Sequence, residues 1–230
     1  MHIIRYVRRD DGSPGLGTLA QGRVCPMAGL SGFADLLALD LDEARSRLDS
    51  ADHEASLPLE SVLTLPPVEG LMEVWDSGLS YERSMDARVA ESQVRDAHSW
   101  VYDAQRPELF FKSPPCRVVT DGEPVAVRPD SEVTVPEPEL ALLIMSRGQV
   151  LGYGICSDMS SRNIEGANPL YIPQNKTSAG SCAAAVGRRC GPPPASASSA
   201  PSRGCSSCPG TAVWSTSSRR GRRRPHRGAC

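Results

Sequence analysis

Two glutamates stand two positions apart in a segment that has the pattern of a β-strand. Glu137 and Glu139 belong to the run E-P-E-L-A-L-L-I-M, and the two-residue period of a strand places both carboxylates on one face. Asp158 ends a second apolar run after a Gly-containing turn, and strand pairing would bring it alongside. Because three converging carboxylates repel one another without a cation, the pattern indicates a site for Mg²⁺ or Mn²⁺ rather than Zn²⁺. On spacing alone, the alternative is a pair of charges that protect an edge strand.

Longer blocks of sequence surround these carboxylates. Residues 158–176 form D-M-S-S-R-N-I-E-G-A-N-P-L-Y-I-P-Q-N-K, and E-V-W-D-S-G-L-S-Y-E-R-S (73–84) and R-P-E-L-F-F-K (106–112) stand upstream. Together, across residues 1–182, the blocks resemble the fumarylacetoacetate hydrolase superfamily, and most closely its branch of 2-keto-3-deoxy sugar-acid dehydratases.

The resemblance implies roles for individual residues. Carried over by position, Glu137, Glu139 and Asp158 match the metal ligands, Lys176 matches the catalytic lysine, and Lys112 matches a lysine near the substrate. A divalent ion chelated by a 2-oxo acid stabilises the enolate that forms when a base, here Lys176, removes a proton from C3. Without the resemblance, Lys176 would be interpreted as a surface lysine.

A departure from the hydrolases of the family favours one reaction. Those enzymes carry a histidine shortly after the first block, whereas S-Y-E-R-S-M-D-A-R contains none, and Tyr81, Arg83 and Ser84 resemble pocket residues of the dehydratases. The alternative for Arg83 and Ser84 is a solvated charge and a helix cap. We therefore predict a Mg²⁺- or Mn²⁺-dependent lyase that dehydrates a 2-keto-3-deoxy pentonate. Hydrolysis of a C–C bond in an acylpyruvate is the alternative, and decarboxylation is a third chemistry of the family.

The composition changes after Cys182. Residues 183–230 contain nine arginines, nine serines and no acidic residue, whereas residues 1–182 hold all 27 Asp and Glu against 16 Lys and Arg. Such a segment buries too little apolar surface to offset the entropy of folding, so we expect a disordered tail. Its Arg, Ala, Gly, Pro and Ser content is typical of a GC-rich gene read out of frame. We interpret the tail as a frameshifted replacement for the last strands of the catalytic domain, and expect little or no activity in consequence.

The basic tail also suggests a function of a different class. The run R-R-G-R-R-R-P-H-R (219–227) would bind nucleic acid without sequence preference. Cys205, Cys208, His226 and Cys230 are residue types that bind zinc, but few bulky apolar residues lie between them. We interpret nucleic-acid binding by the tail as non-specific and incidental.

Strand patterns outnumber helix patterns along the chain. We expect an α+β fold with the mixed β-roll of the family's C-terminal domain, divided into a small N-terminal domain (1–66), a catalytic domain (67–182) and the tail (183–230). The specific expectations are strands at 2–7, 72–79, 110–112 and 131–145, helices at 33–39, 42–48 and 85–104, and a hairpin joining 117–120 to 124–127. Apolar runs are too short for a signal peptide or a membrane span, which predicts a cytoplasmic protein without a membrane partner. The resemblance implies a homo-oligomer.

Overall fold

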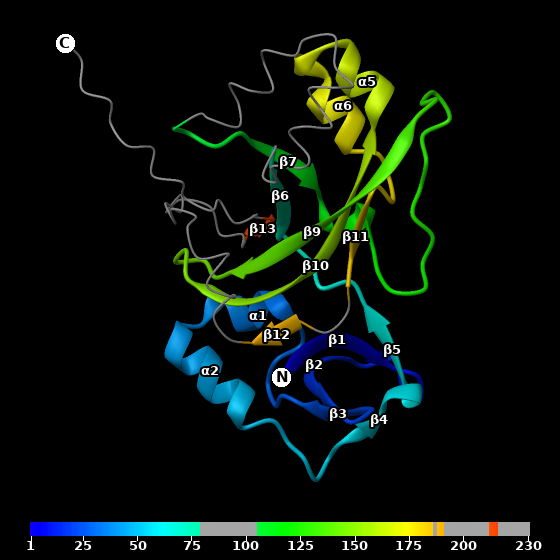
Figure 1. Ribbon diagram of the computed structural model, residues 1–230. Helices are drawn as coiled ribbons and strands as arrows, with labels where there is room; N and C mark the ends of the chain where they lie inside the picture. Colours follow the sequence, from blue (N-terminus) through cyan, green and yellow to red (C-terminus); the bar gives the residue numbers. More distant parts are fainter. Residues whose placement is uncertain (79–104, 186–187, 191–211, 216–230) are drawn as a thin grey trace, which may run out of the picture.

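The computed structural model describes residues 1–78, 105–185, 188–190 and 212–215 (Figure 1). The strands are β1 His2–Arg8, β2 Pro14–Ala20, β3 Arg23–Pro26, β4 Leu57–Pro58, β5 Val62–Leu65, β6 Glu73–Ser77, β7 Leu109–Ser113, β8 Val118–Val119, β9 Thr134–Ile144, β10 Val150–Ser161, β11 Cys182–Ala184, β12 Arg188–Cys190 and β13 Ala212–Ser215. The helices are α1 Phe33–Ala38, α2 Leu41–Asp49, α5 Arg162–Ala167 and α6 Ile172–Lys176, with 3₁₀ turns η1 Leu59–Ser61, η2 Pro115–Arg117 and η3 Pro169–Tyr171.

A mixed sheet connects the described strands. Its order is β4-β3-β2-β1-β12-β10-β9-β13-β6-β7, with β5 joined to β1 and with β11 joined to both β10 and β8. The β11–β8 and β13–β6 pairs are parallel and the other pairs are antiparallel. Figure 1 shows the long strands β9 and β10 curving across the middle of the molecule, with α5 and α6 at one end and β1–β5 beyond the other side. The predicted α+β fold with a mixed sheet is confirmed.

Two short helices follow the first three strands, close to the predicted ranges 33–39 and 42–48. Helix α1 starts after Gly32, because the backbone N–H and hydroxyl of Ser31 both donate to the carboxylate of Asp35. Helix α2 starts earlier than the expected Asp42, because the carboxylate of Asp40 accepts from the backbone N–H of Glu43 at 2.8 Å and satisfies a free donor of the first turn.

One buried apolar cluster joins the N-terminal elements to the long strands. Phe33 and Leu37 of α1 are fully buried in the same cluster as Leu143 of β9 and Met145 just beyond it. The backbone of Ser146 also donates to the carbonyl of Leu37. The end of β9 is therefore held against α1. The domain boundary near Pro66-Pro67 stays a prediction.

The expected hairpin between residues 117–120 and 124–127 is wrong. Only Val118–Val119 is a strand there, and it pairs in parallel with β11 rather than with the residues that follow. Pro124 has no backbone N–H to donate, and the carboxylate of Glu123 instead accepts from the N–H of Thr120 at 2.7 Å. The N–H of Ala126 bonds to the carbonyl of Gly180.

Parts of residues 183–230, expected to be disordered, form strands. Strand β11 begins at Cys182, β12 pairs with β1 and β10, and β13 pairs with β6 and β9. These ranges correct the expectation of a wholly unstructured tail, because a backbone can join a sheet ladder whatever its side chains. The rest of the tail and the expected helix 85–104 lie outside the described residues. Within the part that the structure describes, no helix is long and apolar enough to span a bilayer.

Candidate active site

The carboxylates identified in the sequence lie on β9 and β10. The two strands pair antiparallel, with Glu137 opposite Asp158 and Glu139 opposite Cys156. Paired residues point to the same face of a sheet, so both glutamates and Asp158 share one face, as predicted. Pro136 and Pro138 are exposed on the other. The turn between the strands is closed by a bond from Met145 N–H to Gln149 O at 2.8 Å, with Gly148 at φ +81°.

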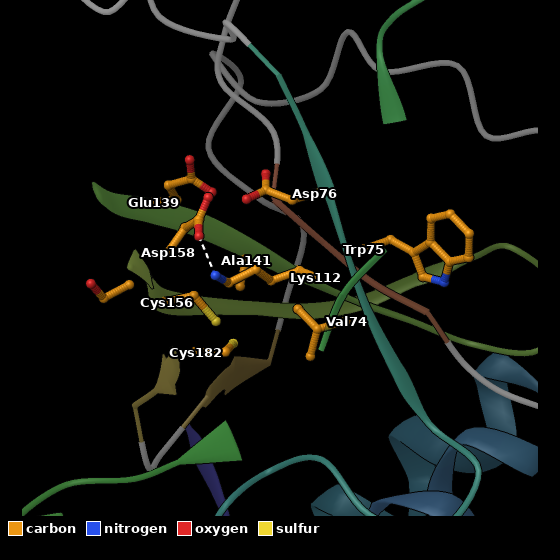
Figure 2. A pocket seen from close by; sticks show the side chains of 10 residues that line it. Val74, Trp75, Asp76, Lys112, Glu139, Ala141, Cys156, Asp158 and Cys182 are labelled. Carbon is orange, nitrogen blue, oxygen red and sulfur yellow. Dashed lines mark ion pairs between the residues drawn. The ribbon is translucent and has the colours of Figure 1, made fainter. Parts of the chain in front are cut away.

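Three carboxylates, one each from β6, β9 and β10, converge at this face. Asp76, Glu139 and Asp158 each offer an oxygen atom within 4.8 Å of the other two. Figure 2 shows the three carboxyl groups pointing toward one another. Asp76 and Asp158 are buried, and Glu139 is half-buried. Burial, followed by the charges of Glu139 and Asp158, raises the pKa of Asp76 well above its usual value. The surroundings of Asp76 therefore favour its protonated form more than water does.

Lys176 lies at the end of α6 with its ammonium among these acids. Its Nζ donates to Asp158 Oδ2, to Glu137 Oε2 at 2.8 Å and to Ser160 Oγ at 2.6 Å. Burial lowers the pKa of Lys176, but the charges of Asp158 and Glu137 outweigh burial, so the pKa is raised above its usual value. Since all three donors are used, Lys176 is a fixed ammonium in this arrangement.

Glu137 stands beside the carboxylate cluster rather than in it. Its carboxylate accepts from Lys176 and Ser160 on one oxygen and from Arg162 Nη2 at 2.7 Å on the other. Arg162 Nη1 also bonds Glu165, which is buried, at 2.7 Å. Glu137 therefore connects the ammonium of Lys176 to a second ion pair on α5.

Lys112 on β7 is the second buried lysine of the site. Its Nζ pairs with Asp158 Oδ1, and it donates to the carbonyl oxygens of Met159 at 3.2 Å and Lys176. Only 1% of Lys112 is exposed. The side chain predicted to lie near the substrate is thus in contact with one proposed metal ligand and with the backbone of the proposed catalytic lysine.

The structure brings together Glu139, Asp158, Lys112 and Lys176, and places Glu137 at their edge. Tyr81, Arg83 and Ser84 lie outside the described residues. Sequence reasoning did not identify Asp76, Ser160, Arg162 or Glu165. The sequence did contain a signal for Asp76. In β6, Val74 and Asp76 alternate on the buried face, and an acid on a buried face is unusual. Ser160 and Arg162 continue the two-residue period that starts at Asp158.

The donor set fits a hard divalent cation. All three groups of the cluster are carboxylates, which suit Mg²⁺ or Mn²⁺, and the cluster has no histidine or thiol. Burial raises the pKa of Asp76 most, and the neighbouring charges of Glu139 and Asp158 raise it further, so a bound cation would stabilise the ionised form of the cluster. Asp76, Glu139 and Asp158 would hold such an ion.

The known proteins that this chain resembles have similar names. A probable 2-keto-3-deoxyxylonate dehydratase of Haloferax volcanii is 44% identical over 144 residues, which is 62% of this chain and 46% of that protein. A 2-dehydro-3-deoxy-D-arabinonate dehydratase of Saccharolobus solfataricus is 52% identical over 115 residues, or 48% of this chain and 39% of that protein. A solved structure of 2-keto-3-deoxy-D-arabinonate dehydratase complexed with magnesium and 2,5-dioxopentanoate matches with a TM-score of 0.69 and 28% identity, covering 95% of this chain and 88% of the other. No family model matches the chain.

The matches to the two curated relatives span less than half of each relative's length, 46% and 39%. The three named proteins share a reaction type and a substrate class, and both agree with the prediction made from the sequence blocks.

Proposed function

Because this chain belongs to the fumarylacetoacetate hydrolase superfamily, we propose that it serves as a Mg²⁺- or Mn²⁺-dependent dehydratase of a 2-keto-3-deoxy sugar acid, most closely a pentonate, in the cytoplasm. The observation that carries the proposal is the cluster of Asp76, Glu139 and Asp158 with the ammonium of Lys176 bonded to Asp158. Acids for a hard cation and a lysine for proton transfer are the two parts that this chemistry needs.

The carboxylates hold the cofactor and orient the substrate. Glu139 and Asp158 match metal ligands in the sequence resemblance and lie in the carboxylate cluster, so we propose them as ligands together with Asp76. We also propose Glu137 as a ligand. Its carboxylate must first break its ion pairs with Lys176 and Arg162. When bound, the cation supplies a Lewis acid that polarises the 2-oxo group and so acidifies the protons on C3.

Lys176 is the proposed group for proton transfer. The carboxylates of Asp158 and Glu137 favour the ammonium of Lys176, and binding of a divalent ion by the carboxylate cluster would weaken this preference and favour the amine. The amine removes a proton from C3 of the substrate, and the ammonium that results is a proton source for the hydroxyl that leaves C4 as water. Lys112 keeps Asp158 and the carbonyl of Lys176 in place during the transfer. General acid–base catalysis of this kind contributes about 10²–10⁴ in rate.

The test is substrate conversion with a variant control. The purified chain is incubated with a 2-keto-3-deoxy pentonate with and without Mg²⁺, and the dehydrated oxo product is followed by mass spectrometry. Whatever amount of product this chain forms should depend on Mg²⁺ and on Lys176, so Lys176→Ala should give none, and a chain with the family-type C-terminal strands restored should give more. Cleavage of an acylpyruvate without any dehydration would instead establish the hydrolase alternative.

A further inference from the structure

Two cysteines lie in the same pocket as the carboxylate cluster and have no part in the proposed reaction. Cys156 on β10 and Cys182 on β11 line the pocket together with Asp76, Glu139 and Lys112. Their exposed fractions are 7% and 1%, and neither is in a disulfide bond. In Figure 2 both sulfur atoms lie on the side of Lys112 opposite the acids.

The strand register brings the two thiols together. Asp158 is opposite Cys182 and Cys156 is opposite Ala184, so the two cysteines are diagonal neighbours on one face of the β10–β11 pair. The thiols are hydrogen-bonded to each other. Both are buried, and Cys156 is the more exposed of the two.

We propose that Cys156 and Cys182 are a redox-active dithiol that closes to a disulfide between β10 and β11 on reaction with a small-molecule disulfide. Cys156, the more exposed of the two, attacks one sulfur of the reagent and forms a mixed disulfide while one small thiol leaves. Cys182 then attacks the Cys156 sulfur and releases the second small thiol. The two protein thiols lose two electrons, the reagent gains them, and the two thiol protons end on the two released thiols.

Closing the bond changes the geometry beside the metal ligands. Diagonal neighbours have Cα atoms about 7–8 Å apart, whereas a disulfide requires about 4.4–6.8 Å. Closing the bond therefore requires β11, a strand of three residues that pairs on its other side with the two-residue strand β8, to shift along β10. Asp158, which lies opposite Cys182, moves with this pairing. The oxidised form thus has a weaker metal site, a consequence that rests on the proposed function.

Peptide mapping tests the disulfide itself. The full chain is treated with oxidised glutathione under native conditions, quenched in acid, alkylated and digested with trypsin. Cys156 and Cys182 fall in separate peptides, 148–162 and 177–188, each with a single cysteine. We expect these two peptides to be linked, at a mass two hydrogen atoms below their sum. Recovery of both peptides alkylated, or carrying only glutathione, would overturn the proposal.

Variants separate the pair from the other thiols. Cys25 is also a buried thiol but lies in the N-terminal part of the core, so Cys25→Ser should leave the 148–162 to 177–188 link unchanged. Cys182→Ser should abolish the link and leave glutathione on 148–162. If Cys25→Ser or Cys182→Ser fails to fold, Cys25→Ala and Cys182→Ala give the same comparison. A link that persists between 148–162 and any peptide of the Cys182 variant would show non-specific exchange and refute the pair.

The effect on the metal site is measured separately. Mg²⁺ should raise the Tm of the reduced chain, and the rise should be smaller after oxidation and return on treatment with dithiothreitol. If Mg²⁺ raises the Tm of the disulfide-linked chain as much as that of the reduced chain, the coupling to Asp158 is refuted, whereas the disulfide itself is not. A reduced chain that Mg²⁺ does not stabilise would instead count against the proposed function, whatever the peptide map shows.

Discussion

Glu137 and Asp158 are register partners across β9 and β10, and the ammonium of Lys176 bridges their carboxylates. Asp158 and Lys176 are each 3% exposed, so the bridge is made with little water. Buried charges are tolerated only when they are paired, and here the protein supplies its own cation beside the acids that would bind a metal ion. The ammonium and a divalent cation therefore compete for Asp158.

The first prediction concerns the stability that this bridge provides. Replacing Lys176 by Met leaves Asp158 and Glu137 without a main partner, and loss of one member of a buried pair costs about 3–5 kcal/mol. We expect Lys176→Met to lower the free energy of unfolding by that amount without metal, and Mg²⁺ to recover part of it. Urea denaturation followed by circular dichroism measures both values. Arg45→Met on the surface of α2 is the control and should change little; equal effects of the two substitutions would contradict the ion-pair role.

The second prediction concerns the metal ligands. Because Glu139 and Asp76 each supply an oxygen to the cluster, Glu139→Gln and Asp76→Asn should each weaken Mg²⁺ binding. The loss should exceed about 10–100-fold, which is typical even for groups that only support a ligand. Calorimetric titration gives the affinity, and Glu43→Gln on α2 is the matched control because it removes an exposed carboxylate far from the site. Equal Mg²⁺ binding by Glu139→Gln and Glu43→Gln would remove the basis for the assignment.

The third prediction separates Glu137 from Glu139. Glu137 has to give up its bonds to Lys176 and Arg162 before it can bind a cation, whereas Glu139 already faces the cluster. Glu137→Gln should therefore weaken Mg²⁺ binding less than Glu139→Gln does. Its larger effect should be on turnover, since Lys176 loses a partner that positions it. The reverse order of the two affinities, measured in the same titration, would show that Glu137 is the stronger ligand.

Local sequence patterns predicted the elements that carry the site but not all of its members. The period of two in Glu137 and Glu139 and the turn at Gly148 determine β9, β10 and their shared face, because these are properties of the chain over a few residues. Asp76 was not identified because its approach to Asp158 depends on where β6 enters the sheet, 82 positions away in the chain. Strand β12 illustrates the same limit, since its Arg-rich sequence has no strand pattern and only its neighbours β1 and β10 account for it.

The state of Lys176 could not be predicted either. The sequence comparison suggested a base, for which a lowered pKa is expected, whereas the structure surrounds the ammonium with acceptors that raise it. Two opposing effects, burial and the nearby carboxylates, decide the sign, and only the positions of Asp158 and Glu137 beside the ammonium show which is larger.

The fourth prediction is a pH dependence of metal stabilisation. The pKa of Asp76 is raised in the folded chain by burial and then by Glu139, whereas in the unfolded chain an aspartate titrates near about 3.9. Without metal, the folded chain therefore binds a proton that the unfolded chain releases. Asp76 contributes its stability fully below about pH 3.9, and that contribution is lost as the pH rises through the raised value. Mg²⁺ competes with this proton, so its binding releases the proton and strengthens as the pH rises.

The increase in Tm caused by Mg²⁺ should accordingly be larger at about pH 8 than at about pH 5.5, because fewer protons compete with the metal for Asp76 at the higher pH. Scanning fluorimetry at a fixed Mg²⁺ concentration measures the increase at each pH. Asp76→Asn cannot hold the proton, so it should give a small increase that varies less with pH. Calorimetry in two buffers of different ionisation enthalpy gives the number of protons released. A Mg²⁺ effect that is constant with pH in the unmodified chain, with no proton released, would show that Asp76 does not share its site with the metal.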